Sequence, residues 1–106
     1  MTQAELFQAL ESIGYPVAYN AFSKPTPLPY IVYKYSFSSD MVADNVNYAE
    51  IGNFQIELYT EKKDTAAEKK VQDKLRELGL PYRKFEAFLD TEGAFQILYE
   101  IQLIGG

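Results

Sequence analysis

Apolar residues recur along this chain with two spacings, one typical of helices and one typical of strands. Within the first fourteen residues, Leu6, Leu10 and Ile13 fall on one face of a helix. Thr2 stands where a capping box begins, with Glu5 three residues later, and the pattern stops near Gly14. This segment therefore predicts a short amphipathic helix.

A second helix is predicted between the acidic residue Asp64 and Gly79. Either Asp64 or Thr65 can cap its first turn, and Pro81 prevents the helix from restarting after Gly79. The apolar positions repeat with helical spacing and predict one buried stripe. They are Ala67, Val71, Leu75 and Leu78.

Side-chain alternation predicts four strands, at 30–37, 53–60, 82–89 and 95–103. A fifth, short strand is possible within 17–22. In the first strong strand, alternation places four apolar side chains on one face. They are Ile31, Tyr33, Tyr35 and Phe37.

Two one-sided helices and several alternating strands indicate an α+β domain spanning residues 1–106. We expect two helices packed on one face of a mostly antiparallel sheet of four to five strands. A long β-hairpin arm, at about residues 38–52, is expected to project from that sheet.

The arm is predicted because residues 38–53 are far more than a tight hairpin needs. Period-two alternation continues back from the second strand to about Val46, with Gly52 as a bend or bulge. An apolar tip on such an arm indicates contact with another polypeptide. The alternative is a loop that folds over the sheet edge. The predicted interface residues are Asp40, Met41, Val42, Asp44, Asn45, Val46, Tyr48 and Glu50.

The composition removes several kinds of chemistry. The chain has no cysteine and no histidine, so it lacks a thiol nucleophile and the commonest general base and metal ligand. Its net charge is −5, and eight of its ten basic residues lie between Lys62 and Lys84, interleaved with acids. This indicates a solvated helix face and no groove for nucleic acid. Neither a signal peptide nor a membrane-spanning segment is predicted, so we expect synthesis in a cytoplasm.

Candidate catalytic and binding groups are few. A Ser–Lys pair stays open, because Ser23, Ser36, Ser38 and Ser39 are available. Three acids of the arm, Asp40, Asp44 and Glu50, could act as acid and base or bind a hard cation, but the twelve residues from Asp40 do not fit a calcium-binding loop. Glycine-rich phosphate loops are absent. We therefore expect no catalytic residue, no cofactor and no metal site.

Aromatic residues of the first two strong strands could stack on nucleic-acid bases, but no basic residue lies between Tyr35 and Glu61. A sheet core together with a protein interface explains them better. These residues are Tyr30, Tyr33, Tyr35, Tyr48, Phe54 and Tyr59.

Two stretches carry a family resemblance that covers nearly the whole chain: PLPYIVYKYSFSSDMVADNVNYAEIGNFQIELYTEKKD and GLPYRKFEAFLDTEGAFQILYEIQL. With a capped helix between them, they resemble small tail-terminator or tail-completion proteins, which join head to tail in long-tailed phages and prophages of Gram-positive bacteria. The similarity lies in the style of the sequence, and no catalytic signature is part of it.

The resemblance implies a structural protein that is not an enzyme. Such proteins form a homo-oligomeric ring, typically a hexamer, at the head-proximal end of the tail tube. The expected partners are further copies of the chain, the tail-tube protein and a head-completion or connector protein, with DNA only passing through the ring. The expected location is the tail–head junction of the virion, with no membrane contact. Two alternatives stay open: another small connector or minor tail component, and a cytoplasmic ligand-binding regulatory domain or enzyme.

Overall fold

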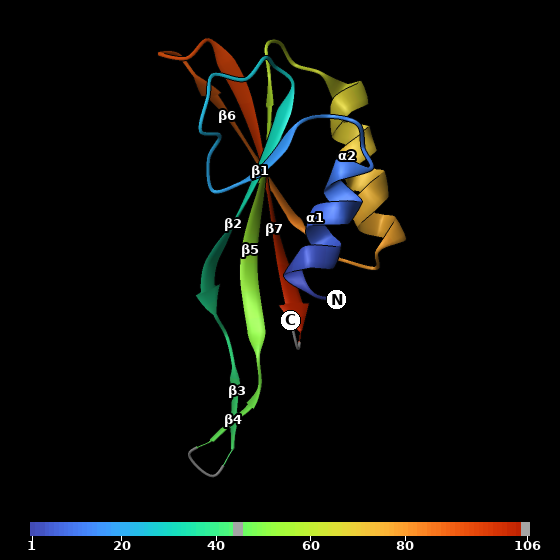
Figure 1. The fold of residues 1–106 in the computed structure, drawn as a ribbon, viewed down its shortest axis with the longest axis vertical. Helices are drawn as coiled ribbons and strands as arrows, with labels where there is room; N and C mark the ends of the chain where they lie inside the picture. The colour runs from blue at the N-terminus through green and yellow to red at the C-terminus, as the bar shows by residue number, and fades with distance from the viewer. Residues whose placement is uncertain (44–45, 105–106) are drawn as a thin grey trace.

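The computed structural model describes residues 1–43 and 46–104, and for residues 41–43 and 46–49 it describes only the backbone. Two helices and seven strands are formed within this part of the chain (Figure 1). In chain order they are α1 (Gln3–Glu11), β1 (Val17–Tyr19), β2 (Tyr30–Ser38), β3 (Met41–Ala43), β4 (Val46–Ala49), β5 (Ile51–Thr60), α2 (Thr65–Glu77), β6 (Arg83–Leu89) and β7 (Ala94–Ile104).

Five strands form one sheet in the order β1-β2-β5-β7-β6, and β3 and β4 form a separate two-stranded sheet. All pairs in the large sheet are antiparallel except β1 with β2, which is parallel. The predicted α+β class, with two helices and a mostly antiparallel sheet, is confirmed. None of the helices in the described residues is long and apolar enough to cross a membrane.

Both helices begin and end with the local signals that the sequence predicts. The Thr2 side chain accepts from the backbone N–H of Glu5, whose carboxylate accepts from the Thr2 N–H, which completes the capping box. At α2, the cap is Asp64, whose carboxylate accepts from the Ala67 N–H at 3.0 Å. Gly79 has a φ of +70°, and the next residue's N–H bonds back to the Leu75 carbonyl.

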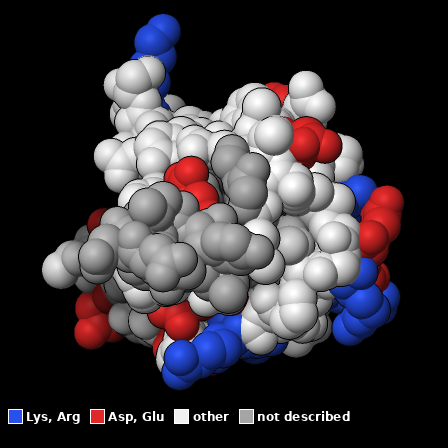
Figure 2. Space-filling model, turned by 90° about the horizontal axis from the view of Figure 1, so that it is seen from below, with Lys and Arg blue, Asp and Glu red and all other residues white. Residues whose placement is uncertain are grey.

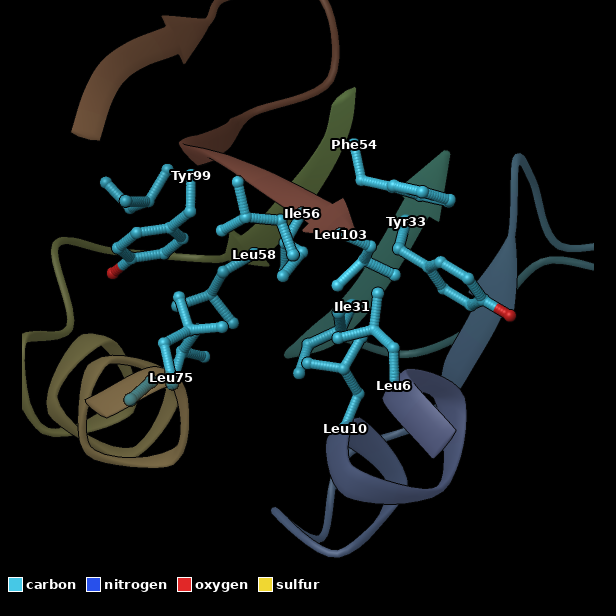
Figure 3. Packing of buried hydrophobic residues seen from close by; sticks show 14 residues of the cluster. Leu6, Leu10, Ile31, Tyr33, Phe54, Ile56, Leu58, Leu75, Tyr99 and Leu103 are labelled. Atoms are coloured by element: carbon cyan, nitrogen blue, oxygen red, sulfur yellow. The ribbon is translucent and has the colours of Figure 1, made fainter. Parts of the chain in front are cut away.

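The hydrophobic core lies between the two helices and one face of the sheet (Figure 3). Leu6 and Leu10 from α1 and Leu75 from α2 are fully buried against strand residues. The register of the strands explains which strand residues are buried. Directly opposite residues share a face of the sheet, and the apolar positions of β2, β5 and β7 stand opposite one another. The strand residues of the core are Ile31, Tyr33, Phe54, Ile56, Leu58, Ile97, Tyr99, Ile101 and Leu103.

The opposite face of the sheet, here called the open face, is covered only in part, by the loop of residues 20–29. Phe22 in this loop packs edge-to-face on Tyr30, with ring centroids 5.1 Å apart. Val32 and Glu57, both on the open face, are only 5% exposed. The loop thus replaces a helix as the connection between the parallel strands β1 and β2.

A register shift between Tyr35 and Phe37 changes the face of the sheet on which the last side chains of β2 lie. Tyr35 stands opposite Phe54 on the helix side, whereas Phe37 stands opposite Asn53 on the open face. The extra residue, Ser36, forms a β-bulge, which switches the side chains that follow to the other face. The prediction that Phe37 shares the face of Ile31 is therefore wrong. The predicted bulge at Gly52 is also wrong, because the shift lies on the partner strand.

A buried carboxylate connects α2 to the edge strand β6. The Glu68 side chain is 4% exposed, and its two oxygens lie 2.7 Å from Lys84 Nζ and 2.8 Å from Lys63 Nζ. Lys63 also pairs with Glu86 on β6. Burial by itself would raise the pKa of Glu68, but the two ammonium groups outweigh burial and lower it. We call these three residues, Lys63, Glu68 and Lys84, the Glu68 clasp.

Replacing Glu68 with Gln is expected to lower the free energy of unfolding at pH 7 by about 2 kcal/mol, because two ammonium groups lose their buried counter-charge. Since the folded pKa lies below the ordinary value of 4.5, the clasp stabilises fully above that value. Its contribution is lost as the pH falls toward the folded pKa. Urea unfolding of both proteins from pH 7 to pH 3 measures this.

The difference between the two proteins should shrink below about pH 4.5, where protonated Glu68 resembles Gln. Glu77→Gln is the matched control, because Glu77 lies on the same helix with its side chain 69% exposed. That control should change stability by no more than about 0.5 kcal/mol. A constant difference between wild type and Glu68→Gln at every pH would contradict the role of the clasp.

Candidate interaction surface

The strands β3 and β4 lie beyond the ends of β2 and β5, at one end of the long axis (Figure 1). Their backbones pair antiparallel, with Met41 opposite Ala49, Val42 opposite Asn47 and Ala43 opposite Val46. A second register shift falls between Met41 and Val42. The described residues measure 49 Å along this axis and at most 28 Å across it. The pair is a narrow extension beyond the five-stranded sheet, and neither helix of the described residues lies beside it (Figure 1).

The two ladders join at a short polar step. The N–H of Ser39 donates to the Ile51 carbonyl at 2.8 Å, and the N–H of Ile51 donates to Oδ1 of Asp40 at 3.2 Å. Asp40 therefore supplies a side-chain acceptor where the backbone ladder of β2 and β5 stops. The carboxylate thus accepts the hydrogen bond of the Ile51 N–H at the point where the chain passes from one strand ladder to the next.

Asn53 fixes the base of this extension from the open face. Its amide nitrogen donates to the Phe37 carbonyl at 3.0 Å and to Ser39 Oγ at 2.7 Å. Its oxygen accepts from Gln102 Nε2 at 3.0 Å. One amide thus links β2, β5 and β7 at the level where the β3–β4 pair begins.

The predicted interface residues fall into three groups: beside the β3–β4 pair, within it, and outside the described residues. Asp40 and Glu50 flank the β3–β4 pair, and the Glu50 side chain is exposed. Met41 and Val42 lie in β3, and Val46 and Tyr48 lie in β4, so their backbones are brought together. Asp44 and Asn45 lie outside the described residues. The strand pairing is as predicted, whereas the complete hairpin and its apolar tip stay predictions.

The charge near this end of the molecule is one-sided. No basic residue occurs in the chain between Lys34 and Lys62, whereas Asp40 and Glu50 lie at the start and end of the extension. Figure 2, which looks along the axis from this end, shows acidic groups beside the residues drawn in grey and basic groups toward the rim. The acids at the base of the extension therefore make the local charge there negative.

Aromatic side chains are also exposed at two opposite edges of the sheet, and of these the sequence pattern predicted only Tyr35 as part of a core and interface. Phe37 is 60% exposed because of the Ser36 bulge, and Tyr35 next to it is 43% exposed. On β6, Phe85 and Phe88 are 43% and 52% exposed. Alternation predicts only which side chains share a face. Whether a helix covers that face depends on tertiary packing.

A hollow of about 520 Å³ lies between the loop 20–29 and the open face. Glu57 lines it, 3.2 Å from Lys34 Nζ and accepting from the Tyr59 hydroxyl at 2.8 Å. Burial and the hydrogen bond with Glu57 raise the pKa of Tyr59, so its phenol stays protonated at neutral pH. Within residues 1–43 and 46–104, no three His, Cys, Asp or Glu side chains gather closely enough to hold a metal ion.

Comparison with known protein families and with curated proteins finds no match for this chain.

Replacing Asn53 with Ala is expected to loosen the base of the β3–β4 pair, because three hydrogen bonds are lost. We expect a loss of about 1 kcal/mol in the free energy of unfolding, since these bonds are exposed. Amide hydrogen exchange should accelerate at Ser39, whose N–H bonds to Ile51. Gln55→Ala, on the same strand and face, is the control and should leave Ser39 unchanged. Equal exchange at Ser39 in all three proteins would contradict this role.

Proposed function

We propose that this chain is a structural subunit of the tail–head junction of a long-tailed phage or prophage, where copies form a ring that caps the tail tube. The observation that carries the proposal is the β3–β4 pair, which extends the sheet beyond its helices in a segment without basic residues. The family resemblance of nearly the whole chain supports the same role.

A ring requires two different surfaces on each subunit, because its contacts are heterologous. The β3–β4 pair offers one such surface at the end of the long axis, where it can reach a neighbouring subunit or the tube. The exposed aromatic residues at the sheet edges offer further contact area. These apolar side chains lie on edge strands. A partner that pairs its own strand with such an edge would cover them.

Charge supports passage of DNA without attachment. A net charge of −5 and acids at the base of the extension disfavour adhesion of phosphate to this end of the molecule. A subunit that lines a DNA channel benefits from such repulsion. The ring, typically hexameric in the family, would thus bind protein on its outer surfaces and leave DNA free to move.

A second candidate function is a small-ligand-binding domain, which the hollow under the loop 20–29 favours. Its lining combines Phe22 and Tyr30 with the acids Glu57 and Glu92, a setting that suits a cationic ligand. The Lys34 ammonium already neutralises Glu57 at 3.2 Å, which weakens this alternative. A different small connector or tail component would share the assembly surfaces and differ in its place in the particle.

Tube length in electron micrographs tests the proposed function. Tail-tube protein from the same genome is polymerised with and without the chain, and the wild type is expected to shorten and cap the tubes. A variant in which residues 41–49 are replaced by an Asn-Gly turn keeps Asp40 and Glu50 and should fold normally. We expect it to lose at least about tenfold in capping, because the contact made by the extension is gone.

Lys24→Ala, in the loop over the open face, is the matched control and should cap as the wild type does. Circular dichroism and thermal unfolding verify that each variant is folded. Tubes that grow to the same length with and without the chain would refute the function. Full capping by the shortened variant would refute the role of the β3–β4 pair.

A further inference from the structure

Seven large apolar side chains are exposed in the described part of the chain, and five of them lie along two opposite edges of the sheet. One group surrounds the end of β2, and the other lies on β6. Edge strands with exposed apolar residues are natural sites for pairing with another chain. The five are Tyr19, Tyr35, Phe37, Phe85 and Phe88.

The β2 edge contains a notch. β1 pairs with β2 only from Ile31 to Tyr33. Beyond Tyr33, the N–H of Tyr35 donates to the Tyr19 hydroxyl at 3.3 Å. No strand in the described residues pairs with the outer side of β2 from Ser36 to Ser38. The side chains there are two serines and Phe37, so the backbone is accessible and carries no charge.

The β6 edge protrudes. This strand pairs with β7 through residues 83–89, and among the described residues no strand lies on its other side. Its first six residues are exposed. Phe88 lies opposite Phe95 on the helix side, and Phe85 lies opposite Leu98 on the open face, so β6 presents an aromatic ring on each face.

We propose that β6 of one subunit occupies the notch beside β2 of a second copy of this chain, and that this antiparallel contact continues the sheet from subunit to subunit. β6 runs antiparallel to β7, and both β2 and β7 run antiparallel to β5. A neighbour in the same orientation therefore brings β6 to β2 antiparallel, which is the more stable pairing. The partner is a second copy because the same sheet carries both the protruding edge and the notch.

Register requires the two subunits to be displaced along the strands. One row of neighbouring residues across the sheet consists of Lys34, Gln55, Glu100 and Arg83. From this row, β6 extends toward one end of the strands, whereas the notch lies toward the other end. A direct sideways contact would bring β1 and β6 of the two copies into collision. A staggered contact avoids this, and stagger with strand tilt is how sheets close around an axis.

Aromatic side chains favour this direction of pairing. Antiparallel pairing brings Phe88, near the end of β6, toward Tyr19 and Tyr35, and Phe88 and Tyr35 both lie on the helix side. Arg83, at the start of β6, points toward the far end of β2 with its side chain 78% exposed on the open face. Glu50 lies on the helix side with Tyr35 and Gly52, so the joint does not depend on a pair between Arg83 and Glu50.

The inference rests on the proposed ring, since it names the contact between ring subunits, but it can fail separately. Tube capping tests the function of the assembly. Disulfide cross-linking tests which edges touch. A ring that caps tubes through other surfaces would leave the function intact and overturn this contact.

Disulfide cross-linking supplies the geometry, since the chain has no cysteine of its own. Ser38 and Glu86 both face the helix side and lie on opposite edges of the sheet, so a bond between them must join two molecules. Oxidation of mixed Ser38→Cys and Glu86→Cys proteins should give the mixed dimer. Ser38→Cys mixed with Glu77→Cys, which lies at the end of α2, is the control.

The possible outcomes separate cleanly. A mixed Ser38–Glu86 dimer at least about tenfold more abundant than the control supports the proposal. Dimers of like variants would indicate a two-fold contact and overturn it. Monomers in every mixture, at concentrations where the wild type self-associates, would show that other surfaces join the copies. Monomers of the wild type at all concentrations would equally count against it.

Discussion

The pairing of β5 on both sides governs this structure. β5 joins β2 and β7 over nearly its full length, and its apolar alternation sets which face receives the helices. Because β7 matches β5 residue for residue from Ile51 to Thr60, a shift of one position would expose the core. Both helices, the loop 20–29 and the β3–β4 pair take their places relative to this central strand.

Much of this arrangement can be predicted because its signals are local. A capping box at Thr2, a carboxylate cap at Asp64 and a left-handed glycine at position 79 all act within a few residues. Alternation in β5 and β7 likewise predicts the core face correctly. Features that depend on distant parts of the chain are a different matter. The parallel partner β1 and the loop over the open face depend on tertiary packing that no periodicity reports.

The candidate surfaces show the same division. The length and composition of residues 38–53 predict an unusual segment, and the paired β3 and β4 lie within it. The bulge at Ser36 has no comparable signal, since serine in a strand is ordinary, yet it decides where Phe37 points. Its consequence is a surface with aromatic residues on both faces of one edge. A one-residue insertion in a ladder has therefore altered the chemistry of that edge.

The Glu68 clasp matters mechanically as well as for stability. Among the described strands β6 has one neighbour, so any pull on its outer side is resisted by the β7 ladder and by the ion pairs that reach it from α2 and from Lys63. The carboxylate is buried, so dissolved salt screens it far less than charges at the surface. A load applied to this edge is thus shared with the helix layer through these ion pairs.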